Sequence, residues 1–217
     1  MANSKSISTI IKQYQESFAM HGDSPAAVMW PRGRQELRFN ALTKHFSNNN
    51  FSVLDFGCGL GHLKSYLDNH YSDYKYYGVD VVPEFIQFVN EKFTGVETKL
   101  INSYSDLNVC FDHVVISGTF NIIEGNDQVA YLKKIKDTLK YLFKLSKLSL
   151  AVNFMTDRVD FTQTNAMHMN VEMITDFMRK HLSARLIIDE SYMPYEFTII
   201  SMKDNEIIRP ENIYRTL

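Results

Sequence analysis

Hydrophobic residues at the start of the chain recur at the three- and four-residue spacing of an amphipathic helix. The run at 21–25, which contains glycine and proline, ends this pattern. A second helix is predicted from about 33 to 45. The apolar face of the first helix consists of Ile7, Ile10, Ile11, Tyr14 and Phe18.

From residue 51 onward, short apolar runs alternate with amphipathic segments. This alternation predicts an α/β fold, in which a mostly parallel sheet carries helices on both faces. The predicted strands are 52–56, 76–79, 98–101, 113–117, 148–153, 185–189 and 196–202. The helices predicted between them are 61–70, 83–93, 126–146 and 170–182.

The last two predicted strands are separated only by residues 190–195, which include a proline. Because a parallel crossover needs a dozen or more residues, the final strand is expected to be antiparallel. We expect one compact unit, with a helical extension at 1–48 and the α/β domain at 49–217. The extension is predicted to pack over a ligand site as a lid.

Composition narrows the class of protein. Of 217 residues, 45% are hydrophobic, which is enough for a sizeable core. A net charge of −2 gives no general attraction to nucleic acid or an anionic membrane. There is no apolar run of ~20 residues and no signal-peptide pattern, so a cytoplasmic protein away from membranes is expected. The two cysteines, Cys58 and Cys110, lack metal-ligand spacing, and no metal is expected.

The segment VLDFGCGLGHL at 53–63 combines a buried strand, an acidic residue and three alternate glycines before a helix. Glycines allow a sharp turn and let a ligand approach the backbone closely. The first turn of the helix offers free N–H groups to an anion. A dinucleotide site is the alternative, but its glycines are spaced GxGxxG. Asp55 would also repel a pyrophosphate and attract the ammonium of a methionine moiety, which favours S-adenosylmethionine.

Two further segments belong with this turn. The second predicted strand ends in YYGVD, which places Asp80 25 residues after Asp55. In nucleotide-binding α/β folds, the acidic residue that binds the ribose diol follows the glycine turn at a similar distance. The fourth strand is followed by SGTFN at 117–121, at the carboxyl edge where open α/β sheets bind ligands.

The pair VLDFGCGLG and YYGVD resembles motif I and the following acidic motif of class I S-adenosylmethionine-dependent methyltransferases. The resemblance covers about residues 50–203 and implies a Rossmann-like, seven-stranded sheet with its last strand antiparallel. It implies that Gly57 and Gly59 line the methionine part and that Asp80 takes the ribose hydroxyls. The usual acidic residue directly after the third strand, where the family contacts adenine, is missing. The expected cofactor-binding residues are Asp55, Gly57, Cys58, Gly59, Asp80, Val81, Ser117, Gly118 and Arg38.

The expected reaction is methyl transfer to an oxygen or nitrogen of a small polar metabolite. The segment HGDSPAAVMW at 21–30 resembles a subgroup of small-molecule or sugar-modifying methyltransferases, so a sugar-like acceptor is favoured. The loop 153–170 is rich in groups suited to hydroxyls. Within it, His168 is the first candidate base, since histidine accepts protons near neutral pH. Asp157 and Glu124 are the alternatives, and an amine acceptor would need no base.

Two other functions stay open at this stage. One is methylation of RNA or protein, against which the lack of a basic extension argues. The other is a non-catalytic protein that binds S-adenosylmethionine as a sensor or partner subunit. In the preferred interpretation the acceptor is held by the loop 153–170 and by Tyr195 and Glu196. The loop residues suited to hydroxyls are Asn153, Thr156, Asp157, Thr162 and Asn165.

Overall fold

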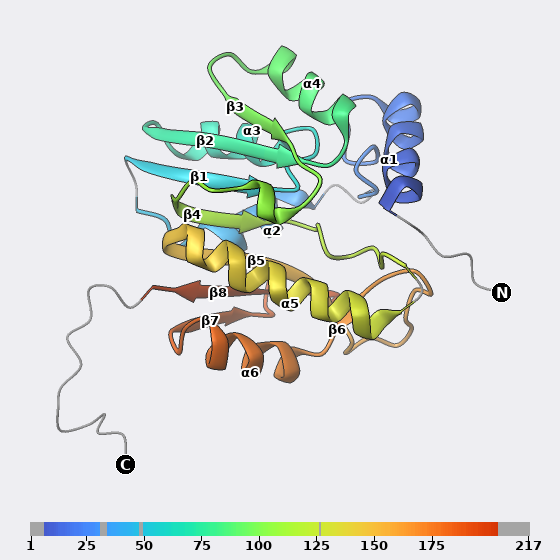
Figure 1. Ribbon diagram of the computed structural model, residues 1–217, viewed down its shortest axis with the longest axis vertical. Helices are drawn as coiled ribbons and strands as arrows, with labels where there is room; N and C mark the ends of the chain where they lie inside the picture. The colour runs from blue at the N-terminus through green and yellow to red at the C-terminus, as the bar shows by residue number, and fades with distance from the viewer. Residues whose placement is uncertain (1–6, 31–33, 48–49, 126, 204–217) are drawn as a thin grey trace.

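The computed structural model describes residues 7–30, 34–47, 50–125 and 127–203, which form a twisted sheet with helices on both faces (Figure 1). The strand order is β3-β2-β1-β4-β5-β8-β7, and β6 pairs with β5. The strands are β1 (Phe51–Phe56), β2 (Tyr74–Asp80), β3 (Glu97–Leu100), β4 (Phe111–Ile116), β5 (Ser146–Thr156), β6 (His168–Met169), β7 (Leu186–Asp189) and β8 (Glu196–Met202).

The direction of β8 confirms the prediction from the short connection that precedes it. β8 pairs antiparallel with both β5 and β7, while the pairs from β3 to β5 are parallel. All seven predicted strands are present, with ends that differ by a few residues. The two-residue strand β6 is an addition, which pairs Met155 with His168.

The predicted helices are also present, with a short 3-10 turn, η1 (Tyr104–Asp106), in addition. Predicted helix positions 33 and 126 lie outside the described residues. The helices are α1 (Ile7–His21), α2 (Gln35–Thr43), α3 (His62–His70), α4 (Pro83–Lys92), α5 (Gln128–Leu145) and α6 (Val171–His181).

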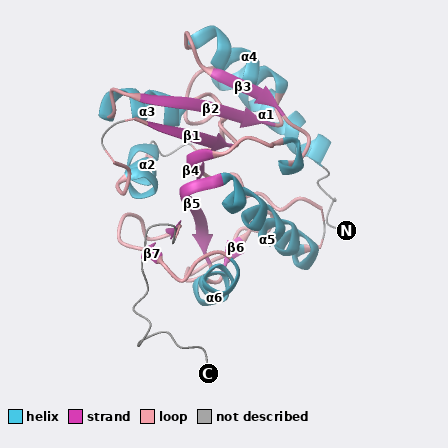
Figure 2. Cartoon of the chain, turned by 60° about the vertical axis from the view of Figure 1, so that its left-hand side comes forward, coloured by secondary structure: helices cyan, strands magenta, loops and turns pink. Residues whose placement is uncertain are grey.

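Alternate residues of the central strands face opposite layers, as the pleat requires. Leu54 and Val114 pack in the cluster that α5 and α6 cover. Val53 and Val115 pack in the cluster that α2 and α3 cover. Figure 2 shows these two pairs of helices on opposite sides of the sheet.

The two helices of the amino-terminal extension are placed differently. Helix α2 belongs to the core, because Leu42 is fully buried against the sheet. Helix α1 packs instead on α4, where the rings of Tyr14 and Phe18 meet Phe85 edge-on. Gln15 donates a hydrogen bond of 2.8 Å to Glu84 at the same contact. α1 therefore lies beside the carboxyl ends of the strands (Figure 1).

The amino half of the central strands buries a pair of histidines. Ser149 Oγ lies 2.6 Å from His45 Nε2 and 2.8 Å from His113 Nδ1. The Phe46 ring stacks on His113 with 4.0 Å between centroids. Burial lowers the pKa of His45 to about 3 and that of His113 to about 4, so both rings are neutral.

Among the described residues, no helix combines the length and apolar character that crossing a bilayer requires.

Candidate functional site

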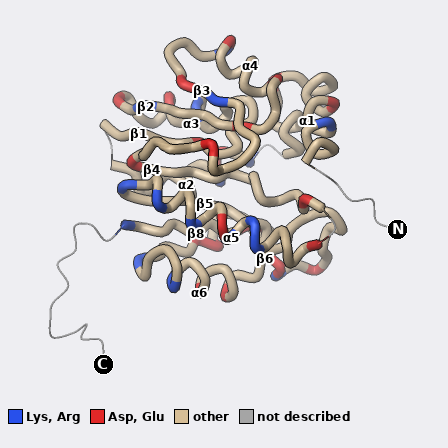
Figure 3. Tube along the Cα trace, in the orientation of Figure 1, with Lys and Arg blue, Asp and Glu red and all other residues tan. Residues whose placement is uncertain are grey.

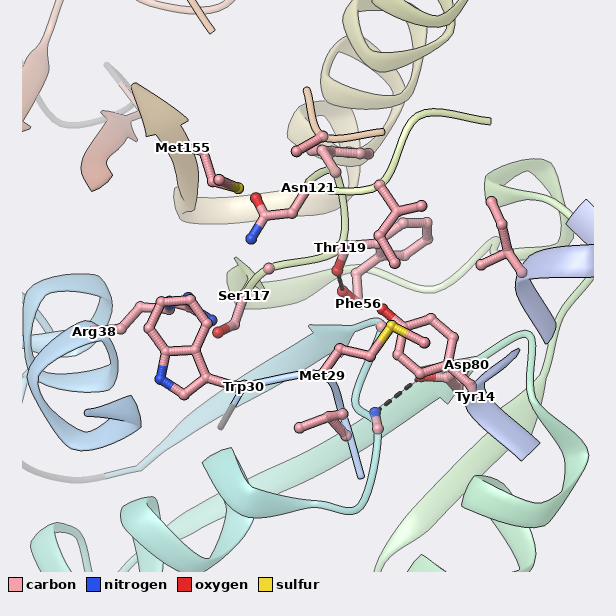
Figure 4. A pocket seen from close by; sticks show the side chains of 18 of the residues that line it. Tyr14, Met29, Trp30, Arg38, Phe56, Asp80, Ser117, Thr119, Asn121 and Met155 are labelled. Carbon is pink, nitrogen blue, oxygen red and sulfur yellow. Dashed lines mark hydrogen bonds between the residues drawn. The ribbon is translucent and has the colours of Figure 1, made fainter. Parts of the chain in front are cut away.

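A cavity of about 1300 Å³ opens at the carboxyl edge of the sheet, over the ends of β1, β2 and β4 (Figure 4). Helices α1 and α2 border it on one side, and the loop 155–168 borders it on another. All ten residues predicted for the site line this cavity. They are Arg38, Asp55, Gly57, Cys58, Gly59, Asp80, Val81, Ser117, Gly118 and His168.

The glycine turn after β1 is held in a conformation that only glycine adopts easily. Gly57 has a φ of +83°, and a Cβ on it would lie 2.3 Å from Thr119 Oγ1. That hydroxyl is fixed, because it donates a hydrogen bond of 2.8 Å to the Phe56 carbonyl. A Cβ on Gly61 would instead lie 2.7 Å from the Phe93 ring, so this third glycine serves packing of α3.

Asp80 ends β2 and organises the turn. Its carboxylate accepts hydrogen bonds from Gly59 N at 2.9 Å and from Val82 N at 3.0 Å. Burial raises its pKa, and the backbone donors lower it again. A carboxylate has about four lone-pair sites, so both oxygens keep acceptor capacity toward the cavity.

Asp55 is the second buried carboxylate at this edge. Its Oδ2 accepts a hydrogen bond of 2.7 Å from the Tyr76 hydroxyl. Burial raises the pKa of Asp55 to about 7, the Tyr76 hydrogen bond opposes this, and the charge of Asp80 adds to it. A cation next to Asp55 would favour its charged form.

A buried polar network connects four elements across the cavity. Arg38 of α2 makes a two-pronged ion pair with Glu196 of β8, with its Nε 2.8 Å from Oε2. Asn153 donates to the same Oε2 at 3.1 Å and accepts from Gly118 N at 2.7 Å. The Trp30 ring lies 4.0 Å from the Arg38 guanidinium carbon (Figure 4). Arg38 is thus largely neutralised within the protein, while its Nη1 borders Gly118.

His168, the predicted base, has backbone partners at both ring nitrogens. Its Nδ1 donates to the Thr156 carbonyl at 2.8 Å, since a carbonyl can only accept. Its Nε2 accepts a hydrogen bond of 3.1 Å from Gln163 N. The ring therefore helps close the acceptor loop on itself.

The residues predicted to hold the acceptor are divided by the structure. Asn165, Tyr195 and Glu196 line the cavity, as does the alternative base Glu124. Asn153, Thr156, Asp157 and Thr162 do not line it, and the first three have structural partners. Asn153 is part of the buried network, the Thr156 hydroxyl accepts from Arg158 N, and Asp157 accepts from Asn170.

Other lining residues were not singled out by sequence as site residues. Tyr14 is one of them, and its apolar spacing indicated only a helix face. The apolar Met155 and the amide Asn121 also line the cavity (Figure 4). Asn121 falls in the segment 117–121 that the sequence placed at the ligand edge, so its position was indicated although its role was not.

The residues that line the cavity include the polar groups that S-adenosylmethionine requires. Asp80 presents carboxylate oxygens suited to a diol, and Asp55 presents one suited to an ammonium group. Asn102 and Ser103, after β3, line the end of the cavity near Asp80 where an adenine is expected. They offer amide and hydroxyl groups in place of the missing acidic residue.

Comparisons with known proteins find methyltransferases. A family model described as a methyltransferase domain matches residues 53–141. A putative methyltransferase of Mycobacterium tuberculosis, Rv1506c, is 27% identical over 155 residues, which are 70% of this chain and 93% of the relative.

Solved structures with the same fold include proteins bound to the cofactor or its product. Magnesium protoporphyrin IX methyltransferase of Synechocystis with bound SAH has a TM-score of 0.63 at 15% identity, covering 90% of this chain and 95% of that one. Human N-acetylserotonin methyltransferase in complex with SAM has a TM-score of 0.60 at 13% identity, covering 88% and 62%. Residues 53–141 thus match a methyltransferase domain, and the chain has the fold of solved S-adenosylmethionine-dependent methyltransferases.

Proposed function

We propose that this enzyme methylates an oxygen or nitrogen of a small polar metabolite, with sugars and sugar-like compounds as first candidates. The size and continuity of the cavity carry this proposal. At about 1300 Å³ it exceeds the ~300–1,000 Å³ of a typical single-ligand pocket. It also runs from the cofactor residues to the loop at 155–168, which leaves space for a second small molecule.

The charges around the cavity support a small acceptor over RNA. Among the described residues, the Lys and Arg side chains that line it are Arg34, Arg38 and Lys134. Arg38 is paired with Glu196, and Lys134 with Glu124. Binding of a polyanion needs a row of cations that can neutralise phosphates. Along the described chain, acidic and basic residues are instead interspersed (Figure 3).

We assign the cofactor contacts residue by residue. Asp80 holds the ribose hydroxyls, Asp55 holds the ammonium, and the turn at 57–59 lines the methionine part. Arg38 has Nη1 left for the methionine carboxylate, since Glu196 takes its other two nitrogens. S-adenosylmethionine supplies a methyl group on a sulfonium, which a lone pair on oxygen or nitrogen displaces. The protein's contribution is alignment and exclusion of water.

We also propose that residues 21–34 act as a lid with α1. The rest of the predicted lid segment, 35–39, begins α2, and its Arg38 and Phe39 are buried in the core. Trp30 stacks on Arg38, and Tyr14 of α1 lines the cavity, so closure over the cofactor would exclude water. Residues 31–33 of this segment lie outside the described residues. Hydrogen exchange should slow across 20–40 when S-adenosylhomocysteine binds, while α6 serves as the internal control. Unchanged protection there would refute the lid.

A hydroxyl acceptor also has to lose a proton, and His168 is the first candidate to receive it. For this role Nε2 must exchange the Gln163 N–H for the acceptor, which needs a local change of the loop. The pH–rate profile of His168→Gln tests the assignment. Full turnover with the same profile would leave Glu124 as the alternative along the cavity wall, since Asp157 does not line it.

The main test is transfer of a radiolabelled methyl group from S-adenosylmethionine to a panel of candidate acceptors. The panel contains sugars, polyols, phenols, amines and carboxylic acids, with total RNA and a protein extract as rival substrates. Label on a hydroxyl- or amine-bearing small molecule supports the proposal. Label confined to RNA or protein, with calorimetry still showing cofactor binding, would reject the small acceptor and keep the methyltransferase.

A further inference from the structure

Asn121 stands in the turn after β4, and its backbone is fixed on both sides. Its N–H donates to the Gly118 carbonyl at 3.3 Å, and its carbonyl accepts from Met167 N at 2.8 Å. The next residue, Ile122, forms an isolated antiparallel bridge with Ala166. The turn is therefore attached to the acceptor loop, and the Asn121 side chain extends from a defined position.

The side-chain amide of Asn121 is not used by the protein. Within the described chain, its Oδ1 is buried and lacks any hydrogen-bond partner. The side chain lines the cavity and lies between Met155 and Ser117 (Figure 4). Asn153 provides the contrast, since both of its amide atoms have protein partners.

Next to this amide, Gly118 allows the Arg38 guanidinium to approach the backbone closely. A Cβ on Gly118 would lie 3.0 Å from Arg38 Nη1 and 3.8 Å from Asn121 Nδ2. Gly118 is thus bordered by N–H donors of Arg38 and Asn121, and the buried Oδ1 belongs to the same Asn121 amide. A buried acceptor without a partner is unfavourable, and folded proteins usually satisfy such atoms with water or ligand.

We propose that Asn121 binds the methyl acceptor: when its amide turns toward the cavity, Oδ1, which is buried in the ligand-free chain, accepts a hydrogen bond from an O–H or N–H of that molecule. A hydroxyl fits the surroundings of the Asn121 amide best, because it donates to Oδ1 and accepts from the neighbouring N–H groups. A carboxylate, ether or thioether has no hydrogen to give to Oδ1. This inference rests on the proposed function and narrows its substrate class to acceptors that carry a hydroxyl or an amine.

The first experiment observes the Asn121 side-chain amide by ¹H–¹⁵N NMR in the complex with S-adenosylhomocysteine. The amide pair is assigned by its loss in Asn121→Asp. The probes are methyl β-D-glucopyranoside, glycerol, phenol, benzylamine and hexanoate. Hydroxyl and amine probes are expected to shift this pair, and hexanoate is not. A shift caused only by hexanoate, or no shift with any hydroxyl or amine probe, would overturn the proposal.

The second experiment compares kcat/KM of variants on whichever of these probes is methylated. Asn121→Ala should lower it about tenfold or more, the effect of one lost hydrogen bond in a buried site. Asn121→Asp, which keeps an acceptor oxygen, should recover part of the loss. Asn108→Ala removes an exposed asparagine outside the cavity and is the matched control. The melting temperature of Asn121→Ala should stay near wild type, because the backbone bonds of the turn remain.

Calorimetry with S-adenosylhomocysteine distinguishes a failure of the Asn121 role from a failure of the methyltransferase assignment. Asn121→Ala is expected to bind this product with unchanged affinity. If the variant also transfers methyl groups as fast as the wild type, the role of Asn121 is wrong and the methyltransferase assignment stands. If the wild type itself binds no S-adenosylhomocysteine, the cofactor site fails and the inference about Asn121 fails with it.

Discussion

The two ends of the central sheet bury polar side chains in opposite ways. At the amino end, His45 and His113 share the Ser149 hydroxyl under the Phe46 ring, and burial keeps both rings uncharged. At the carboxyl end, Asp55 and Asp80 border a cavity of about 1300 Å³. Burial there raises carboxylate pKa values that a bound cation would lower again.

This difference shows that a buried polar cluster does not by itself mark a functional site. The histidine pair packs against Phe46 in the core, and each ring keeps one buried nitrogen without a hydrogen-bond partner but borders no part of the cavity. The carboxylates keep unused lone pairs and line the cavity, so a ligand can complete their hydrogen bonding. The two ends of the sheet should therefore differ in how their substitutions change stability, pH dependence and cofactor affinity.

The largest effect is expected from breaking the buried ion pair at the carboxyl end. Arg38→Ala leaves the Glu196 carboxylate buried without its cation, which should lower the free energy of unfolding by about 3–5 kcal/mol. Urea denaturation measures this loss. The control Lys44→Ala breaks the more exposed pair with Asp189 and should cost ~1 kcal/mol or less. Combining Arg38→Met with Glu196→Gln should recover part of the stability, and equal losses for Arg38→Ala and Lys44→Ala would contradict the argument.

The next effect concerns the pH dependence that Asp55 gives to the ligand-free protein. Its pKa rises from 3.8 to about 7 on folding, so its stabilising effect is full below about pH 4 and is lost by about pH 7. The change is of order 1.4 kcal/mol for each pH unit in that window. Asp55→Asn should remove this decline, which urea denaturation at pH 5 and pH 8 can measure.

The same variant should bind S-adenosylmethionine more weakly, because it loses the charge opposite the ammonium. Tyr76→Phe sharpens the test. Without the Tyr76 hydroxyl, the pKa of Asp55 should rise further and the decline should extend to higher pH. An unchanged pH profile in both variants would show that Asp55 does not titrate in this range.

The amino end should have the opposite pH dependence. Because folding lowers the pKa of His113 from 6.5 to about 4, its stabilising effect is full above about pH 6.5 and is lost as the pH falls toward 4. The loss is of order 1.4 kcal/mol per pH unit in that window. His113→Phe keeps the stacking on Phe46 and should flatten this acid-side slope in a thermal unfolding series. His21→Phe, at the exposed last residue of α1, should leave the slope unchanged.

The smallest of these effects is on cofactor affinity. Asp80→Ala should weaken binding of S-adenosylmethionine by about 1–3 kcal/mol, since it removes charged acceptors for the ribose hydroxyls. Asp80→Asn keeps one acceptor oxygen and should lose less. Calorimetry measures both, with Asp68→Ala on the exposed face of α3 as the control. Wild-type affinity in Asp80→Ala would place the ribose elsewhere.

Local patterns predicted most of the fold. Apolar runs such as 113–117 and 196–202 were long enough to identify strands, and the short connection at 190–195 predicted the direction of β8. The two residues of β6 are too few for any alternation to be visible, and their pairing with β5 depends on the course of the loop. The start of α2 was predicted within two residues, but its burial against the sheet was not.

The site was predictable where its residues lie close in sequence. Asp55, Gly57 and Gly59 form one continuous motif, and Asp80 follows at a characteristic distance. The pair Arg38–Glu196 joins positions 158 residues apart, so only the fold brings them together. Asn153 was predicted from the sequence to bind hydroxyls of the acceptor. In the folded chain both of its amide atoms instead form hydrogen bonds with protein groups. The lack of a protein partner for Asn121 Oδ1 is likewise a property of the packed structure.

The reversed direction of β8 has a practical consequence for attaching the enzyme to a support. Glu196 begins this strand at the cavity, and Met202 ends it at the opposite edge of the sheet, where Lys203 N bonds to the Leu148 carbonyl. A fusion or immobilisation tag joined beyond Lys203 starts far from the mouth of the cavity. One joined before α1 starts beside Ile7, which lines the cavity. Anchoring through the carboxyl-terminal side should therefore leave solutes free to enter and leave, and anchoring through the amino-terminal side should slow turnover.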